Sequence, residues 1–95
     1  MNEHITYGEF YIPDRMMGGI RRYVDHGIPP GSFLTAVICN DFVRACGTAD
    51  DENLRNLPAY ADYFYNEVPG NVWGSKKKMD AWVLKKEKER EEKDK

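Results

Sequence analysis

The stretch GIPPGSFLTAVICND, residues 27–41, constrains the fold more than any other part of this chain. Pro29 and Pro30 cannot continue a helix, and together they hold the backbone extended. Ser32 is a good N-cap, so we predict a helix that begins there and runs to about residue 46. The prolines and glycines therefore end one helix and start the next.

The segment 13–27 has the apolar spacing of a helix. Pro13 stands at a first helical position and Asp14 in the first turn, and apolar residues recur at intervals of three and four. Gly18 and Gly19 interrupt the helix interior, where each costs roughly 1 kcal/mol relative to alanine. We expect a bend at these glycines, or the close approach of another backbone.

A second long helix is predicted after the 32–46 helix. Thr48 or Asp50 should cap it, its apolar face should extend to about Val68, and it should be kinked or irregular near Pro58. The two helices carry apolar stripes that can face each other across a short turn. This arrangement predicts an antiparallel helical hairpin.

The two ends of the chain differ from this body. Residues 1–12 are rich in aromatic residues without a sustained period, which indicates an extended arm ordered in part by aromatic contacts. A last helix, capped by Ser75, should run into a tail of alternating charge that frays or is disordered. We therefore divide this all-α chain into an arm (1–12), a helical domain (13–84) and a charged tail (85–95).

Charge is unevenly distributed, although the net charge of the 95 residues is only −2. Residues 1–75 contain five Arg, no Lys and ten acidic residues, whereas residues 76–95 contain nine basic and six acidic residues. The acidic body cannot readily face the many phosphates of a duplex, so we predict no long nucleic-acid partner. The longest apolar run, 33–39, is too short to span a membrane, and the N-terminus lacks a signal-peptide pattern. We expect no membrane partner and a cytoplasmic location.

Few residues have a pattern typical of catalysis. His4 stands in the arm and His26 beside a helix end, and neither is accompanied by a nucleophile or a second base. The acidic run Asp50–Glu52 is better explained by helix capping. Cys39 and Cys46 lie too far apart on one helix for a disulfide and lack zinc-site spacing, so we expect two buried thiols. We predict no enzyme, no metal and no cofactor.

Small anions are the ligands that the pattern favours. The segment 29–32 exposes a helix start, and Gly31 lets a ligand approach the backbone N–H groups. Lys76, Lys77 and Lys78 oppose the dipole of the last helix, a conflict that a bound anion would relieve. A solvated basic cluster explains these lysines equally well.

Other polar and aromatic residues admit two interpretations. Tyr7, Phe10 and Tyr11 could stack on nucleobases, although packing of the arm on a helix is the commoner role of such residues. Asn40 and Asp41 fall on or beside the apolar face of the predicted 32–46 helix. We expect them to fix the register of packed helices rather than to bind a ligand.

These motifs together resemble the helical hairpin domain shared by phage anti-CBASS and anti-Thoeris sponges. The resemblance covers about residues 12–83 and rests on IPPGSFLTAVICNDF, on Ala49-Asp50 with Asn53, on YNEVP and on WGSKKKMDAW. It implies a compact homohexamer, a trimer of dimers, encoded by a phage or prophage and acting in the host cytoplasm. Its implied activity is to sequester cyclic di- and trinucleotides without cleaving them, which blocks CBASS signalling.

The resemblance also implies two kinds of site. A cyclic dinucleotide pocket between paired protomers would combine an aromatic stack with a basic group, and its candidate residues are Tyr7, Tyr11, Arg22, His26 and Ile28. A cyclic trinucleotide pocket on a three-fold axis would use two loops, and its candidates are Gly27, Pro30, Gly31, Ser32, Pro69, Gly70 and Asn71. Neither loop supplies the lysine or arginine expected there, so the charge beside a phosphate would come from His26 or an arginine elsewhere.

Another class of function stays open at this point. A helical module that inhibits a host protein by direct binding would need an exposed apolar surface and no nucleotide. In that case Tyr11→Ala would leave activity intact, whereas changes on the apolar surface would abolish it. An enzyme acting on the same signals is a third possibility, against which the absence of a paired-histidine or metal-ligand motif counts.

Overall fold

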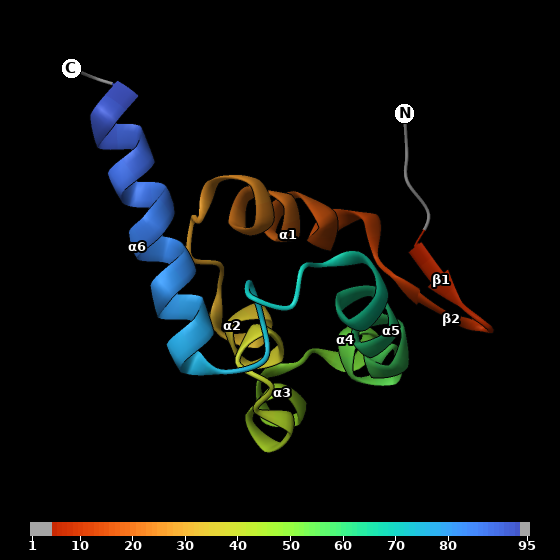
Figure 1. The fold of residues 1–95 in the computed structure, drawn as a ribbon. Coiled ribbons are helices and arrows are strands. Elements are labelled where there is room, and N and C mark those ends of the chain that lie inside the picture. Colours follow the sequence, from red (N-terminus) through yellow and green to blue (C-terminus); the bar gives the residue numbers. More distant parts are fainter. Residues whose placement is uncertain (1–4, 94–95) are drawn as a thin grey trace.

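The computed structural model describes residues 5–93, which form a β-hairpin followed by six helices (Figure 1). The elements are β1 (Ile5–Tyr7), β2 (Phe10–Ile12), α1 (Asp14–His26), α2 (Ser32–Ile38), α3 (Phe42–Thr48), α4 (Asp51–Arg55), α5 (Leu57–Glu67) and α6 (Lys76–Lys93). The described chain is 68% helical, and a small sheet accompanies the helices. His4 and the outermost residues of the predicted arm and tail lie outside the described residues.

The predicted extended arm is an antiparallel hairpin, so the all-α prediction is wrong for this segment. Ile5 pairs with Ile12, and Gly8 makes the turn at a φ of 61°, a conformation that favours glycine. Ile12 is buried in the core, and the backbone N–H of Tyr11 donates to Asn56 Oδ1 at 2.9 Å. The hairpin also contacts α5, so it packs as part of the same body.

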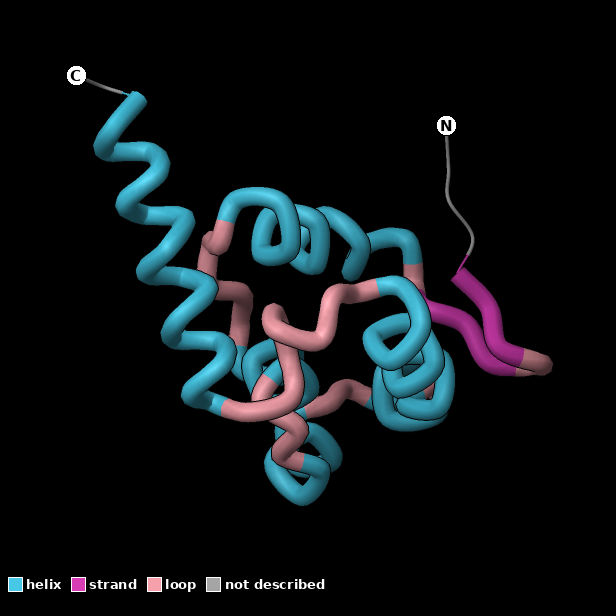
Figure 2. Tube along the Cα trace, viewed as in Figure 1, coloured by secondary structure: helices cyan, strands magenta, loops and turns pink. Residues whose placement is uncertain are grey.

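Helix α1 ends at Gly27 as predicted, begins at Asp14 with Pro13 as its N-cap rather than its first residue, and continues through its two glycines (Figure 2). Gly27 ends it with a φ of 66°, and its N–H donates to the carbonyl of Tyr23 at 2.8 Å. We expected another backbone to lie close to these glycines, but side chains lie there instead. A Cβ on Gly18 would meet the guanidinium of Arg22, and one on Gly19 would meet the side chain of Leu34.

The helix predicted from 32 to 46 is in fact two helices. Helix α2 ends at Ile38, and Asn40 adopts a left-handed φ of 60°. Asp41 is the N-cap of α3, and its Oδ1 accepts from the backbone N–H of Arg44 at 3.2 Å. Asn40 and Asp41 were expected to fix the register of packed helices, but both are exposed and they separate two short helices, so this prediction is wrong.

The same break changes the position of the cysteines. Cys39 follows α2 and Cys46 lies in α3, and both are half-buried free thiols rather than fully buried ones.

The second long helix is also interrupted, between α4 and α5, with Pro58 in the first turn of α5. The irregularity predicted near Pro58 is thus confirmed.

Three predicted caps have different outcomes. Gly31 is the N-cap of α2, and Ser32 is the first helical residue rather than the cap. Asp50 caps α4, where its Oδ1 accepts a backbone N–H of the first turn at 2.8 Å. Ser75 precedes α6, and its Oγ accepts a backbone N–H at 3.1 Å. Side chains that bond the first helical turn account for both confirmed caps.

Helix α6 runs to Lys93, so the described part of the predicted fraying tail is helical. It docks on the end of α1: Trp82 Nε1 donates to the carbonyl of Tyr23 at 3.0 Å, and Arg90 donates to the carbonyl of His26. Its C-terminal part extends beyond the rest of the molecule (Figure 1). No helix within residues 5–93 is long and apolar enough to span a membrane.

The core lies among the hairpin, the helices and the loop after α5. Phe33 of α2 and Tyr60 of α5 meet edge to face with ring centroids 5.1 Å apart, which provides the contact predicted between these helical segments. Tyr23 donates from its hydroxyl to the carbonyl of Val72 at 2.6 Å, tying α1 to that loop. The buried hydrophobic residues are Ile12, Met17, Ile20, Tyr23, Phe33, Leu34, Ala36, Ile38, Ala45, Ala59, Tyr60, Phe64, Val68, Val72 and Met79.

Candidate functional site

Four of the predicted site residues line one groove between α1 and the start of α2. Its volume is about 320 Å³. We call it the cation groove, and its lining residues are Arg15, Met16, Gly19, Arg22, Ile28, Pro29, Pro30, Gly31 and Leu34. Arg22 and Ile28 were predicted for one pocket and Pro30 and Gly31 for another, so the fold brings parts of both sets together.

Arg22 supplies the available positive charge of this groove. Its guanidinium lies beside the α1 backbone at Gly18, where a Cβ would be 3.2 Å from Nη1. Within residues 5–93, no carboxylate forms an ion pair with it. An unpaired guanidinium beside apolar walls can bind a phosphate or carboxylate with two parallel hydrogen bonds.

Arg15 lines the same groove but is already paired. Its Nη2 lies 2.9 Å from Asp50 Oδ2 and 3.1 Å from Glu52 Oε1. These hydrogen bonds, to Glu52 first, raise the pKa of Arg15 above its ordinary value. The pKa of Asp50 is lowered, mainly by the backbone N–H of Asn53, and that of Glu52 mainly by the hydroxyl of Tyr11. Arg15 therefore holds α1 to α4.

Tyr11 and Tyr7 lie on the hairpin and do not line the cation groove. The hydroxyl of Tyr11 donates to Glu52 Oε2 at 2.7 Å, and this bond is the main cause that raises the pKa of Tyr11. Tyr11 lines a separate groove of about 430 Å³ along the hairpin, and Tyr7 is exposed on β1. His26 stands at the other end of α1, so the fold of this chain does not bring it together with the tyrosines (Figure 1).

The other predicted positions lie outside the cation groove. Gly27 is buried beneath α6, where a Cβ would be only 2.6 Å from that of Lys86. Ser32 is exposed in the first turn of α2. Pro69, Gly70 and Asn71 form an exposed turn between α5 and α6. The three lysines that open α6 are exposed, and Lys76 is paired with Asp80 at 2.8 Å.

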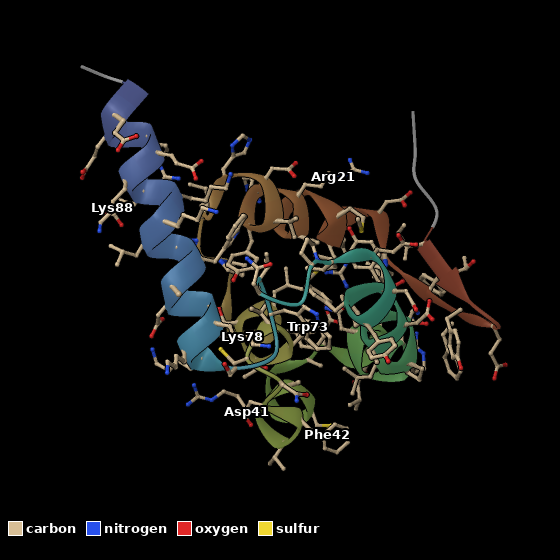
Figure 3. All side chains as sticks on the ribbon, in the orientation of Figure 1. Arg21, Asp41, Phe42, Trp73, Lys78 and Lys88 are labelled. Atoms are coloured by element: carbon tan, nitrogen blue, oxygen red, sulfur yellow. The ribbon has the colours of Figure 1, made fainter. Side chains whose placement is uncertain are left out.

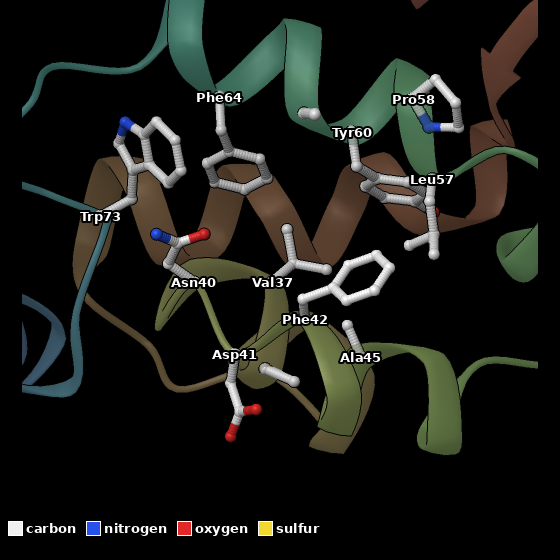
Figure 4. A pocket seen from close by; sticks show the side chains of 12 residues that line it. Val37, Asn40, Asp41, Phe42, Ala45, Leu57, Pro58, Tyr60, Phe64 and Trp73 are labelled. Atoms are coloured by element: carbon white, nitrogen blue, oxygen red, sulfur yellow. The ribbon is translucent and has the colours of Figure 1, made fainter.

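A second groove, which the sequence did not reveal, lies between the α2–α3 break and α5 (Figure 4). We call it the aromatic groove; its lining residues are Ala36, Val37, Asn40, Asp41, Phe42, Ala45, Leu57, Pro58, Tyr60, Ala61, Phe64 and Trp73. Trp73 packs against Phe64 with ring centroids 5.8 Å apart, which joins the loop after α5 to that helix. Phe42 is 71% exposed and lies with Asp41 at the end of the body opposite α1 (Figure 3).

Buried polar residues tie α4 to the rest of the molecule. Tyr60 donates from its hydroxyl to Asn53 Oδ1 at 2.6 Å, and Asn56 Nδ2 donates to the carbonyl of Glu52 at 2.9 Å. Asn53 and Asn56 are 3% and 4% exposed. Burial raises the pKa of Tyr60. Sequence analysis singled out Asn53 only as part of a motif, and its bond to Tyr60 could not be predicted from local pattern.

The cation groove has the chemistry of a binding site. Its side chains are two guanidiniums surrounded by proline, aliphatic and thioether groups, and none of the lining residues within the described chain is a nucleophile or general base. No group of three or more His, Cys, Asp or Glu among residues 5–93 could hold a metal ion. The arrangement can hold an anion next to an apolar surface.

Comparison with known proteins returns no match. No family model matches the chain, and no curated protein or solved structure does.

Proposed function

We propose that this protein binds cyclic di- and trinucleotides and sequesters them without cleavage. The observation that carries the proposal is the unpaired guanidinium of Arg22 in a groove with apolar walls. A guanidinium matches the planar, bidentate hydrogen bonding of a phosphodiester, and the walls can cover a ribose or a base. In this role the protein is a phage- or prophage-encoded counter-defence protein that blocks CBASS signalling in the host cytoplasm.

The size and charge of the groove support a small ligand. A volume of about 320 Å³ falls within the range of roughly 300–1,000 Å³ that is usual for small-molecule sites. One available guanidinium in an acidic body suits a ligand with a few phosphates better than a polymer with many. Retention without cleavage fits a lining that has no nucleophile or base.

Assembly is the second part of the proposal. Phe42 lines the aromatic groove and is exposed, and Val43 and Tyr65 are further exposed apolar side chains on α3 and α5. Such surfaces usually mark an interface, which supports the homohexamer, a trimer of dimers, as the working form. In that form a neighbouring protomer would bring Tyr7, Tyr11 or His26 to the ligand held at Arg22.

Isothermal titration calorimetry with cyclic GMP–AMP and a panel of other cyclic di- and trinucleotides tests the proposal. Arg22→Gln removes the charge and should weaken binding by about tenfold or more, the loss expected for a charge-assisted hydrogen bond. Arg44→Gln is the matched control, because Arg44 is exposed on α3 outside the cation groove, and it should bind as the natural protein does. No heat of binding across the panel, or equal affinity of Arg22→Gln, would overturn the proposal.

A helical module that binds a host protein is the second candidate function. The exposed side chains of Phe42 (71%), Val43 (80%) and Tyr65 (78%) are the observation that favours it. In that case Phe42→Asp should abolish the biological activity while Arg22→Gln leaves it unchanged. The nucleotide-binding proposal predicts that Arg22→Gln abolishes it.

A further inference from the structure

We infer that Gly18 is a positioning residue for the cation groove, because the side chain that it lacks leaves the space in which the guanidinium of Arg22 lies. The inference rests on the proposed role of Arg22 as the phosphate ligand. It assigns a function to a glycine that is unfavourable where it stands, in the interior of α1.

Backbone conformation does not account for this glycine. The glycines with positive φ in the described chain are Gly8, Gly27 and Gly74, so Gly18 adopts a backbone that alanine would adopt as well. Helix α1 also continues through the position. What Gly18 provides is therefore space beside the helix rather than conformational freedom.

The space beside Gly18 is filled by Arg22. An ideal Cβ on Gly18 would lie 3.2 Å from Nη1, 3.9 Å from Cζ and 4.0 Å from Nη2 of that arginine. Residues four apart lie on the same face of a helix, so the side chain of Arg22 folds back along α1 over the glycine. Apart from the backbone of α1 and the adjacent residues, these are the nearest atoms to that Cβ position.

The neighbouring glycine has a different role. A Cβ on Gly19 would lie 3.2 Å from Leu34 Cδ1, and Leu34 is buried in the core. Gly19 thus permits α2 to pack on α1, and its replacement would press on the core. Gly18 meets only the movable end of a long side chain, so a methyl group there displaces the guanidinium and leaves the core in place.

Gly18→Ala should therefore separate stability from binding. Alanine has the higher helix propensity, so thermal unfolding should occur at a higher temperature than in the natural protein. The displaced guanidinium loses its alignment with a phosphate, and affinity for cyclic GMP–AMP should fall about tenfold. Gly47→Ala is the matched control, because Gly47 is helical, lies in α3 and has no atom within 4 Å of its Cβ position.

Two measurements on ¹⁵N-labelled protein decide the inference. The Nε–Hε NMR signal of Arg22 should move in Gly18→Ala and stay in place in Gly47→Ala, and calorimetry should show the loss of affinity in Gly18→Ala alone. In an Arg22→Gln background, Gly18→Ala should cause no further loss. An unmoved Arg22 signal, or a natural protein that binds cyclic GMP–AMP no more tightly than Gly18→Ala does while both bind measurably, would overturn the inference. If the natural protein binds none of the cyclic nucleotides while the signal moves, the positioning role stands and the proposed function fails.

Discussion

The two grooves at the ends of α2 have the same volume, about 320 Å³, but opposite chemistry. The cation groove lies where the Pro29–Gly31 turn delivers the chain to α2, and it carries arginines between aliphatic walls. The aromatic groove lies where Asn40 and Asp41 end α2, and none of its lining residues is basic. Each interruption of the helix thus opens a groove, and the residues that flank it decide what the groove can bind.

A second contrast lies within the cation groove itself. Arg15 and Arg22 are seven residues apart on α1 and line the same space. The fold brings Asp50 and Glu52 to Arg15, whereas Arg22 lies over a glycine without an acidic partner in residues 5–93. Two arginines of one helix therefore differ in availability: Arg15 is engaged in exposed ion pairs with Asp50 and Glu52, and Arg22 is available to a ligand.

The largest effect on stability should follow from truncating Phe64, a side chain in the wall of the aromatic groove. Phe64 is fully buried, so Phe64→Ala should lower the free energy of unfolding by about 3–5 kcal/mol through lost burial and a cavity. The neighbouring Tyr65 is 78% exposed, and Tyr65→Ala should change it by no more than about 0.5 kcal/mol. Urea denaturation measures both variants, and similar losses would contradict the assignment of inner and outer faces of α5.

A smaller loss is expected from the hydroxyl of Tyr60. Tyr60→Phe removes the donor 2.6 Å from Asn53 Oδ1 and leaves that buried acceptor without its partner. The expected cost is about 1–3 kcal/mol in the free energy of unfolding. Tyr65→Phe, on the exposed face, is the control in the same urea titration. A cost below about 0.5 kcal/mol for Tyr60→Phe would show that the polar network does not fix α4.

Acid should loosen the contact that Arg15 makes with α4. The pKa values of Asp50 and Glu52 are lowered in the fold from ordinary values of 3.8 and 4.5. Their contribution to stability is therefore present above the ordinary values and is lost as the pH falls through the lower, folded values. We expect the melting temperature to fall in this acidic range.

Asp50→Asn isolates this effect. Asparagine can still cap α4 but cannot titrate, so the decline of the melting temperature below about pH 4 should be shallower in this variant. Calorimetric scans from pH 7 to 2.5 make the comparison. If the melting temperature declines equally at low pH in the variant and in the natural protein, the role assigned to Asp50 is contradicted.

The smallest effect on stability is expected at Phe42. Because this side chain is 71% exposed, Phe42→Asp should change the free energy of unfolding by about 0.5 kcal/mol or less. Its consequence should appear in assembly instead, as a lower molar mass by multi-angle light scattering if the aromatic groove joins protomers. An unchanged hexamer mass would exclude this groove from the interface, and a monomeric natural protein would overturn the proposed assembly.

Local patterns were sufficient where a single residue decides the structure. Pro13 and Gly27 gave the limits of α1, and Asp50 and Ser75 gave two caps. The elements that the sequence did not predict, such as the β-hairpin, depend on tertiary contacts. The hairpin has strands of only three residues, too short for a period, and is held by packing on α5.

The site was foreseeable in its residues but not in its arrangement. Arg22, Ile28, Pro30 and Gly31 were among the candidates, yet only the fold places them in one groove. The pairing of Arg15 could not be foreseen, because its partners lie 35 and 37 residues away. The break at Asn40 was hidden by apolar residues that kept the helical spacing on both sides of it.

The central claim is that Arg22 holds a cyclic nucleotide that the protein leaves intact. The most direct test incubates the natural protein, Arg22→Gln and Arg44→Gln with cyclic GMP–AMP and a cyclic trinucleotide, removes free ligand, denatures the protein and analyses the extract by HPLC. We predict intact nucleotide from the natural protein and from Arg44→Gln, and little from Arg22→Gln. Equal recovery from Arg22→Gln, cleaved nucleotide, or none from any of the three proteins would contradict the claim.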